Sequence, residues 1–75
     1  MKAFILVNLL ECDEQKILDE ILSYKNVLEA YILFGEWDLI VKVEASNPEE
    51  AGTFVMEKIR SIPNVKITST LIVAR

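Results

Sequence analysis

Four segments of this chain have the composition of β-strands, and they are largely apolar at successive positions instead of alternating between apolar and polar residues. In residues 3–10, Ile5 and Val7 fall on one face of an extended strand, while Phe4 and Leu6 fall on the other. An antiparallel sheet with one face in water should alternate. A sheet built from these segments therefore needs cover on both faces, and this requirement limits the folds open to the chain.

The segments predicted as strands are residues 3–10, 27–34, 38–45 and 65–74, with an amphipathic helix after the first and after the third. Asp13 is expected to cap the first helix, and Asn47 with Pro48 is expected to begin the second. The apolar positions expected to face the sheet are Ile17, Leu18, Ile21 and Leu22 in the first helix and Ala51, Phe54, Val55, Met56 and Ile59 in the second.

The order β-α-β-β-α-β predicts an α+β fold of the ferredoxin-like type, a four-stranded antiparallel sheet with two helices on one face. Only residues 35–37 separate the second and third strands, which predicts a tight hairpin with Gly35 at a positive φ. About six or seven large apolar side chains would remain on the other face, and burying them is worth on the order of 10 kcal/mol.

Packing of two such sheets about a two-fold axis, as in the dimeric α+β barrel type, would cover this second face. The alternative is that the edge strands are simply part exposed. The small size of the chain favours pairing, because a domain of 75 residues buries only about 60% of its extended surface. Cys12 is the only cysteine and there is no histidine, so we expect no disulfide, no metal and no cofactor.

The net charge of −4 argues against direct binding of nucleic acid, since phosphate neutralisation supplies most of that affinity. No apolar run reaches the length of a membrane span. The apolar start of the chain is followed by Glu11–Glu14 instead of the small residues of a signal-peptide cleavage site. We therefore expect a cytoplasmic protein that does not contact membranes.

Catalytic residues are not evident in the sequence. The usual general base near neutral pH is histidine, which is absent. Cys12 lies at a strand–helix junction without a basic neighbour in sequence, and Asp13 and Glu14 suit the start of a helix. We expect no enzymatic site.

Two segments invite a functional interpretation. The first is Gly35-Glu36-Trp37-Asp38, in which Gly35 and Asp38 suit a turn but a tryptophan at a hairpin tip does not. The second is Ile62-Pro63-Asn64-Val65 followed by Thr68-Ser69-Thr70, where strand propensity alone could account for threonine.

At these two segments the chain resembles the effector-binding (RAM) domain of the Lrp/AsnC family of amino-acid-responsive transcriptional regulators. That family has a Gly-x-aromatic-Asp hairpin, a Leu-Pro-Gly-Val helix exit and a Thr-x-Thr strand. Asn64 replaces the usual glycine of the helix exit, a mild departure because asparagine tolerates positive φ. Family members usually begin with a helix-turn-helix domain, so we expect residues 1–75 to be a stand-alone ligand-binding and oligomerisation domain.

By this resemblance the domain would pair through its sheets, assemble further, and bind a free amino acid between dimers. The candidate ligand-binding residues are Gly35, Trp37, Asp38, Thr68 and Thr70. Backbone N–H groups near Gly35 suit a carboxylate, while Asp38 and the hydroxyls of Thr68 and Thr70 can accept from an ammonium group. Trp37 is expected to pack at an interface more than to contact the ligand.

The expected function is amino-acid sensing and oligomerisation, regulating amino-acid metabolism through association with itself or with full-length Lrp/AsnC-type regulators. Two alternatives stay open. A cofactor-independent enzyme of the dimeric α+β barrel superfamily shares this element order but needs a polar cavity between helices and sheet. An ACT-type amino-acid-binding domain would have a similar function with different motifs.

Overall fold

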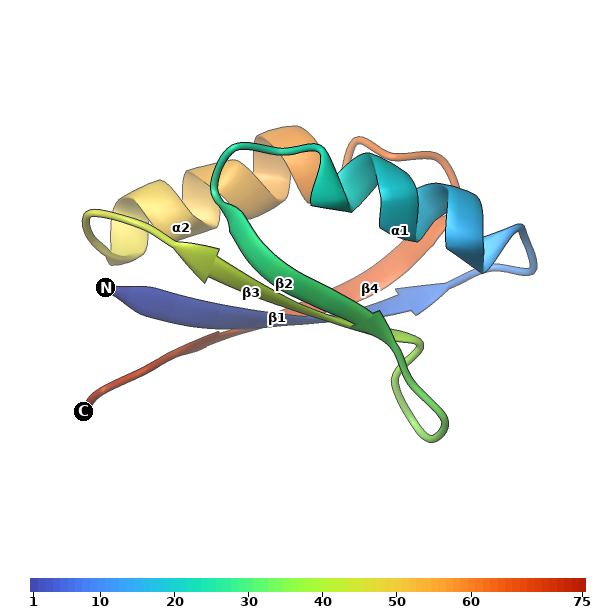
Figure 1. Cartoon of the computed structure of the whole chain (residues 1–75), viewed down its shortest axis with the longest axis horizontal. Helices are drawn as coiled ribbons and strands as arrows, with labels where there is room; N and C mark the ends of the chain where they lie inside the picture. The colour runs from blue at the N-terminus through green and yellow to red at the C-terminus, as the bar shows by residue number, and fades with distance from the viewer.

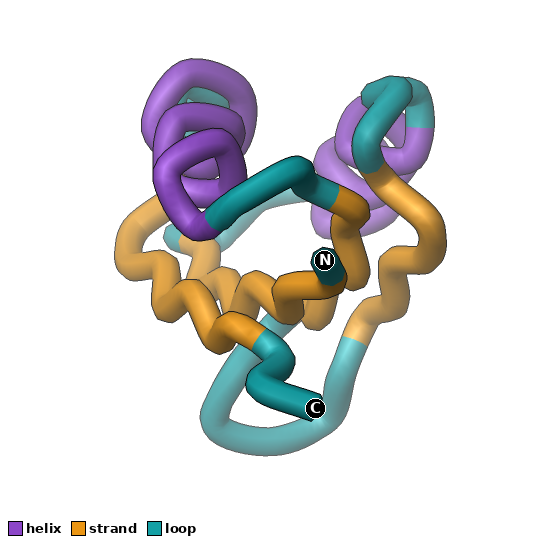
Figure 2. The backbone as a smooth tube through the Cα atoms, turned by 90° about the vertical axis from the view of Figure 1, so that its left-hand side faces the viewer, coloured by secondary structure: helices purple, strands orange, loops and turns teal.

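Two helices cover one face of a four-stranded antiparallel sheet, and the other face is bare (Figures 1 and 2). A computed structural model describes all residues 1–75, and the strand order in the sheet is β2-β3-β1-β4. The elements are β1 (Lys2–Leu9), α1 (Glu14–Leu22), β2 (Val27–Ile32), β3 (Leu39–Glu44), α2 (Pro48–Phe54), the π-helical segment η1 (Val55–Ile59) and β4 (Val65–Ile72). The predicted α+β, ferredoxin-like arrangement is confirmed. Neither helix is long and apolar enough to cross a membrane.

Both helices begin at the predicted caps. The Asp13 side chain accepts a hydrogen bond from the Lys16 N–H at 3.3 Å, and the Asn47 side chain accepts one from the Glu50 N–H at 2.8 Å. Each bond satisfies an N–H that has no partner inside the helix. Pro48 follows its cap directly, where its missing N–H costs nothing.

The buried stripes of the helices are narrower than predicted. Leu22, the last residue of α1, is 46% exposed, and Met56 is 67% exposed, so both expectations were wrong. In η1 the Arg60 N–H donates to the Val55 carbonyl at 2.8 Å, an i to i+5 bond, and Val55 and Ile59 lie on the buried face. Met56, one position further round the helix, then faces water.

The face of the sheet under the helices carries the core. In β1, Ala3, Ile5 and Val7 are fully buried, and their partners Val43, Val41 and Leu39 in β3 are buried with them. Antiparallel partners share a face of the sheet. Every residue in the core is hydrophobic, and no buried polar side chain interrupts it. This layer supplies the hydrophobic free energy that holds the fold together.

The β2–β3 connection is longer than the tight hairpin predicted from the sequence. β2 ends at Ile32 and β3 begins at Leu39, so the predicted strands 27–34 and 38–45 were too long at the loop. The Leu33 N–H donates to the Asp38 carbonyl at 2.8 Å and closes the loop of residues 33–38. Gly35 has the expected positive φ, 142°, and Asn64 has a φ of 76°, in the left-handed region it was expected to tolerate. The predicted starts at Val27 and Val65 are confirmed, and the remaining strand ends differ from prediction by one or two residues.

Candidate functional site

The loop of residues 33–38 extends from the sheet on the side away from the helices (Figures 1 and 2). Gly35 and Glu36 are exposed, and Trp37 and Asp38 are half-buried at the base of the loop. The sequence motif therefore forms a projecting loop with an exposed glycine and with its acid at the sheet.

Asp38 fixes this loop with three hydrogen bonds. Its N–H donates to the Val7 carbonyl at 2.9 Å, its carbonyl accepts from the Leu33 N–H at 2.8 Å, and its carboxylate Oδ2 accepts from the Leu9 N–H at 2.7 Å. A bond to a charged acceptor is about twice as strong as one between neutral groups. The sequence predicted that the carboxylate binds a ligand, with a hydrogen bond to its own turn as the alternative. In the structure its Oδ2 ties the loop to the end of β1, and the ligand-binding role stays a prediction.

A hollow of about 220 Å³ opens beside Asp38 and is partly acidic. Its lining residues are Leu9, Leu10, Glu11, Cys12, Glu14 and Asp38. Burial raises the pKa of the Cys12 thiol, and the carboxylates of Glu14, Asp13 and Asp38 raise it further. These surroundings disfavour the thiolate that a nucleophilic cysteine needs.

Thr68 and Thr70 lie in β4 on the helix side of the sheet. They pair with Val7 and Ile5 of β1, whose side chains are in the core, and antiparallel partners share a face. Thr68 is half-buried, whereas Thr70 is exposed at the sheet edge. Thr68 in β4 and Asp38 next to β3 lie on opposite sides of the end of β1. Their backbones are therefore two strand spacings, or about 10 Å, apart.

Only some of the candidate residues therefore lie at the same end of the sheet. Asp38 and Thr68 lie at the end marked by Val7, and Thr70 lies two residues further along β4. The loop projects from one side of the sheet, and the threonine side chains point to the other. None of the four hollows in the surface is lined by Gly35, Trp37, Thr68 or Thr70. One chain alone does not bring these groups together around a ligand.

The bare face of the sheet, called here the open face, is mainly apolar. The register places Tyr31, Ile40, Leu6 and Ser69 in one row across the strands and Glu29, Lys42, Phe4 and Leu71 in the next. Ile67 lies in a third row, beside Asn8. Tyr31, Ile67 and Leu71 are each at least 50% exposed. The sequence predicted six or seven large apolar side chains on this face. The structure places six there: Phe4, Leu6, Tyr31, Ile40, Ile67 and Leu71.

A polar network interrupts the open face, and sequence reasoning missed it. Lys42 Nζ lies 3.2 Å from the Glu29 carboxylate, which also accepts a hydrogen bond from the Tyr31 hydroxyl, and the same Nζ is 6.0 Å from the centre of the Phe4 ring. These four residues and Ile40 line a hollow of about 240 Å³. The hydrogen bond from Tyr31 and the pairing with Lys42 lower the pKa of Glu29. Glu29 and Lys42 face each other only because of the register between β2 and β3, which the sequence pattern did not reveal.

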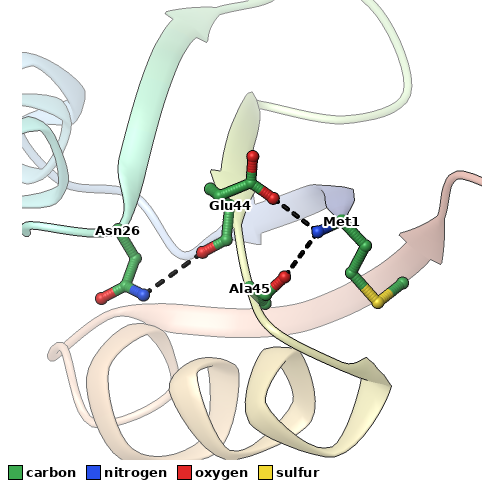
Figure 3. A network of polar contacts seen from close by, with 4 residues as sticks. All are labelled: Met1, Asn26, Glu44 and Ala45. Atoms are coloured by element: carbon green, nitrogen blue, oxygen red, sulfur yellow. Dashed lines mark hydrogen bonds and ion pairs between the residues drawn. The ribbon is translucent and has the colours of Figure 1, made fainter.

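The far end of the sheet is closed by a second polar network (Figure 3). The N-terminal ammonium of Met1 lies 2.6 Å from the Glu44 carboxylate and donates to the Ala45 carbonyl at 2.7 Å. The Asn26 side chain donates to the Glu44 carbonyl at 3.2 Å. The hydrogen bond from the ammonium is the main cause that lowers the pKa of Glu44. These contacts hold β1, β2 and β3 together, and no group of three or more His, Cys, Asp or Glu side chains is arranged to hold a metal ion.

Comparison with known proteins places this geometry in a family. The model of the Lrp/AsnC ligand binding domain matches residues 2–75. An uncharacterized HTH-type transcriptional regulator of Pyrococcus abyssi is 41% identical over 59 residues, which cover 79% of this chain and 39% of the relative. The HTH-type transcriptional regulator FL11 of the same organism is 33% identical over 75 residues, covering 100% of this chain and 49% of FL11. The chain thus spans less than half the length of these relatives.

Solved structures share the fold. FFRP-DM1 superimposes with a TM-score of 0.88 at 40% identity, covering 96% of both chains. E. coli AsnC superimposes with a TM-score of 0.90 at 28% identity, covering 99% of this chain and 50% of AsnC. A transcriptional regulator of Neisseria meningitidis, solved as a complex with L-Met, has a TM-score of 0.87, covering 99% of this chain and 49% of its own, and at 20% identity it supports the fold alone.

Proposed function

The chain belongs to the Lrp/AsnC ligand-binding-domain family, and from this premise we propose that it is a non-enzymatic sensor that binds a free amino acid where subunits meet. The observation that carries the proposal is the loop of residues 33–38, the family's Gly-x-aromatic-Asp segment, held rigidly at the end of β1 by Asp38. A ligand site needs such pre-organised polar groups, because ordering them on binding would cost affinity.

The proposed building block is a homodimer in which two open faces pack together. Six large apolar side chains on that face support this arrangement, since covering them with a second copy would remove apolar surface from water. A two-fold axis is the simplest way to cover the same surface on both copies. The dimers would assemble further, and the protein would act in the cytoplasm.

The amino-acid site would be completed by a neighbouring subunit. Gly35, Asp38, Thr68 and Thr70 do not converge on one hollow within the chain, so groups from another copy must close any pocket that includes them. Backbone N–H groups around Gly35 would bind the carboxylate of the ligand, and the threonine hydroxyls with the Asp38 carboxylate would accept from its ammonium group. Trp37 would pack at the subunit contact. The Neisseria meningitidis regulator, which shares the fold, is itself a complex with an amino acid, L-Met.

Association with full-length regulators of the family is the second part of the proposal. The curated relatives are described as HTH-type regulators, and this chain corresponds to less than half of each. Shared sheet surfaces would let it pair with such a protein and change its assembly on DNA. With a net charge of −4 the chain itself would contribute little to phosphate contacts.

The enzymatic alternative required a polar cavity between the helices and the sheet. That space is filled by core side chains, all hydrophobic, among them Ile5, Ile21 and Ile59 at 0% exposure. This packing favours a sensor over a cofactor-independent enzyme.

The direct test is a thermal-shift screen against the twenty amino acids at millimolar concentration, followed by calorimetry on each ligand that stabilises the protein. A ligand that binds only the folded state raises its stability by about 2.7 kcal/mol at 100 times Kd. No stabilisation by any amino acid would contradict the sensor proposal.

Asp38 offers a matched pair of variants for this screen. Asp38→Asn keeps an acceptor for the Leu9 N–H but removes the charge, so we expect a folded protein whose amino-acid affinity falls by about tenfold or more. Asp38→Ala removes the acceptor as well and should destabilise the protein by about 1–3 kcal/mol. If Asp38→Asn binds amino acids like the wild type, the carboxylate holds the loop and does not contact the ligand.

A further inference from the structure

Phe34 is the most exposed large hydrophobic side chain of the protein. Its relative exposure is 110%, against 67% for the next, Met56, so nothing in the chain shields it. It was expected to lie at the end of a strand, but it follows Leu33, whose bond to Asp38 closes the loop, and precedes Gly35 at a φ of 142°. A large aromatic residue is thus presented to water from a loop whose base is fixed.

The loop lies on the open-face side of the sheet. Figures 1 and 2 show it projecting away from the helices, and the last residues of the chain leave β4 on the same side. A body that packs on the open face must meet the loop that carries Phe34. The loop that carries Phe34 and the row of Tyr31, Ile40 and Leu6 therefore lie on the same side of the sheet.

An exposed aromatic residue beside the sheet adds to the area that a second copy can bury. Four strands spaced about 4.8 Å apart, with about six residues each at about 3.3 Å, outline a face of about 400 Å². A standard interface buries about 800 Å² on each partner. A planar outline understates the accessible surface of the side chains on it, so the sheet supplies more than half of what is needed, and an aromatic side chain adds about 150–250 Å².

We propose that Phe34 anchors the contact between two copies of this chain by inserting against the open face of the partner. The proposal rests on the sheet-to-sheet pairing put forward above. The partner that we propose is a second copy of this chain. In a two-fold dimer each copy contributes its own Phe34, so the loop contributes to the interface twice.

The test is a dilution series from micromolar to nanomolar protein, followed by sedimentation and by the emission of Trp37, the single tryptophan. Phe34→Ser should raise the dimer Kd by about 10- to 100-fold, since buried aromatic anchors dominate such contacts. The monomer of this variant should unfold at the same temperature as the wild-type monomer, because the Phe34 ring is not buried within its own chain. Phe34→Leu, which keeps an apolar side chain, should stay within about tenfold of the wild type.

Met56→Ser is the matched control, an exposed hydrophobic residue on the helix layer, and it should change the Kd by less than about twofold. A dimer that Phe34→Ser leaves intact would overturn the role of Phe34 while leaving sheet pairing in place. Equal losses of dimer affinity in Phe34→Ser and Phe34→Leu would also overturn the role of Phe34, because an apolar side chain at this position would then make no difference. A wild-type chain that stays monomeric at micromolar concentration would overturn the sheet pairing itself.

Discussion

Ile5 and Leu6 are consecutive residues of β1 with nearly the same volume and hydrophobicity, yet they lie in different surroundings. Ile5 points into the core beneath the helices and has 0% exposure, whereas Leu6 points to the open face and is part exposed. The two faces of the sheet cannot be told apart by composition in this strand. What separates them is the covering layer, which belongs to the chain on one face and must come from elsewhere on the other.

The largest expected effect separates these two residues by stability. Ile5→Ala should lower the free energy of unfolding by about 2–5 kcal/mol, because it leaves a cavity in a close-packed core. Leu6→Ala should lower that of the monomer by less than about 1 kcal/mol but should weaken dimerisation. Chemical denaturation at high and low protein concentration distinguishes the two losses. Equal destabilisation of the monomer by both variants would show that the open face is not bare.

Much of the covered layer could be predicted from the sequence because its signals are local. The caps Asp13 and Asn47 and the 3.6-residue spacing of apolar positions depend only on near neighbours. The exceptions are Leu22, the last residue of α1, and Met56, which a regular helix of 3.6 residues per turn already turns away from the stripe of Ala51, Phe54 and Ile59, so the stripe was drawn too wide.

The candidate site could be predicted much less well, because its contacts depend on register and on non-local pairing. The sequence identified Gly35 and Asp38 but not the bond from Leu9 to the Asp38 carboxylate, which links residues 29 positions apart. The Glu29–Lys42 pair likewise requires knowing that the β2–β3 loop closes at Leu33 and Asp38. Contributions from a neighbouring subunit leave no periodic pattern in one chain.

The two tyrosines sharpen the comparison, because Tyr24 lies by the helix layer and Tyr31 on the open face. Burial raises the pKa of Tyr24 to about 12, helped by its hydrogen bond to Glu20, and its ring packs edge-on against Phe54 with centroids 5.9 Å apart. The pKa of Tyr31 is raised mainly by its hydrogen bond to Glu29.

The absorbance of the phenolate gives the test. In Tyr31→Phe the remaining phenol should ionise near pH 12, above the value of 10.0 for a free tyrosine. The folded chain then keeps a proton that the unfolded chain releases, so the stabilisation is complete below pH 10.0 and is lost as the pH rises through about 12. Tyr24→Phe should lose less stability over that range. Ionisation of Tyr24 at the free value would contradict its burial by the helix layer.

The smallest expected effect on a single chain lies in the Glu29–Lys42 pair, and it should grow when the open face is covered. The pKa of Glu29 is lowered, so the pair stabilises the fold above pH 4.5, the ordinary value, and that contribution is lost as the pH falls through the lowered one. On a monomer the pair is exposed and screened by salt, so Glu29→Gln should scarcely change the acid unfolding curve. Beneath a second sheet, protonation of Glu29 would leave the Lys42 charge buried without a partner, which is costly.

The dimer Kd of the wild type should therefore rise as the pH falls below 4.5, while that of Glu29→Gln should change less over the same range. Sedimentation at several pH values measures both. Parallel curves for the two proteins would mean that the second copy does not cover this network, and the open face would then have to pair in a register that leaves Lys42 in water.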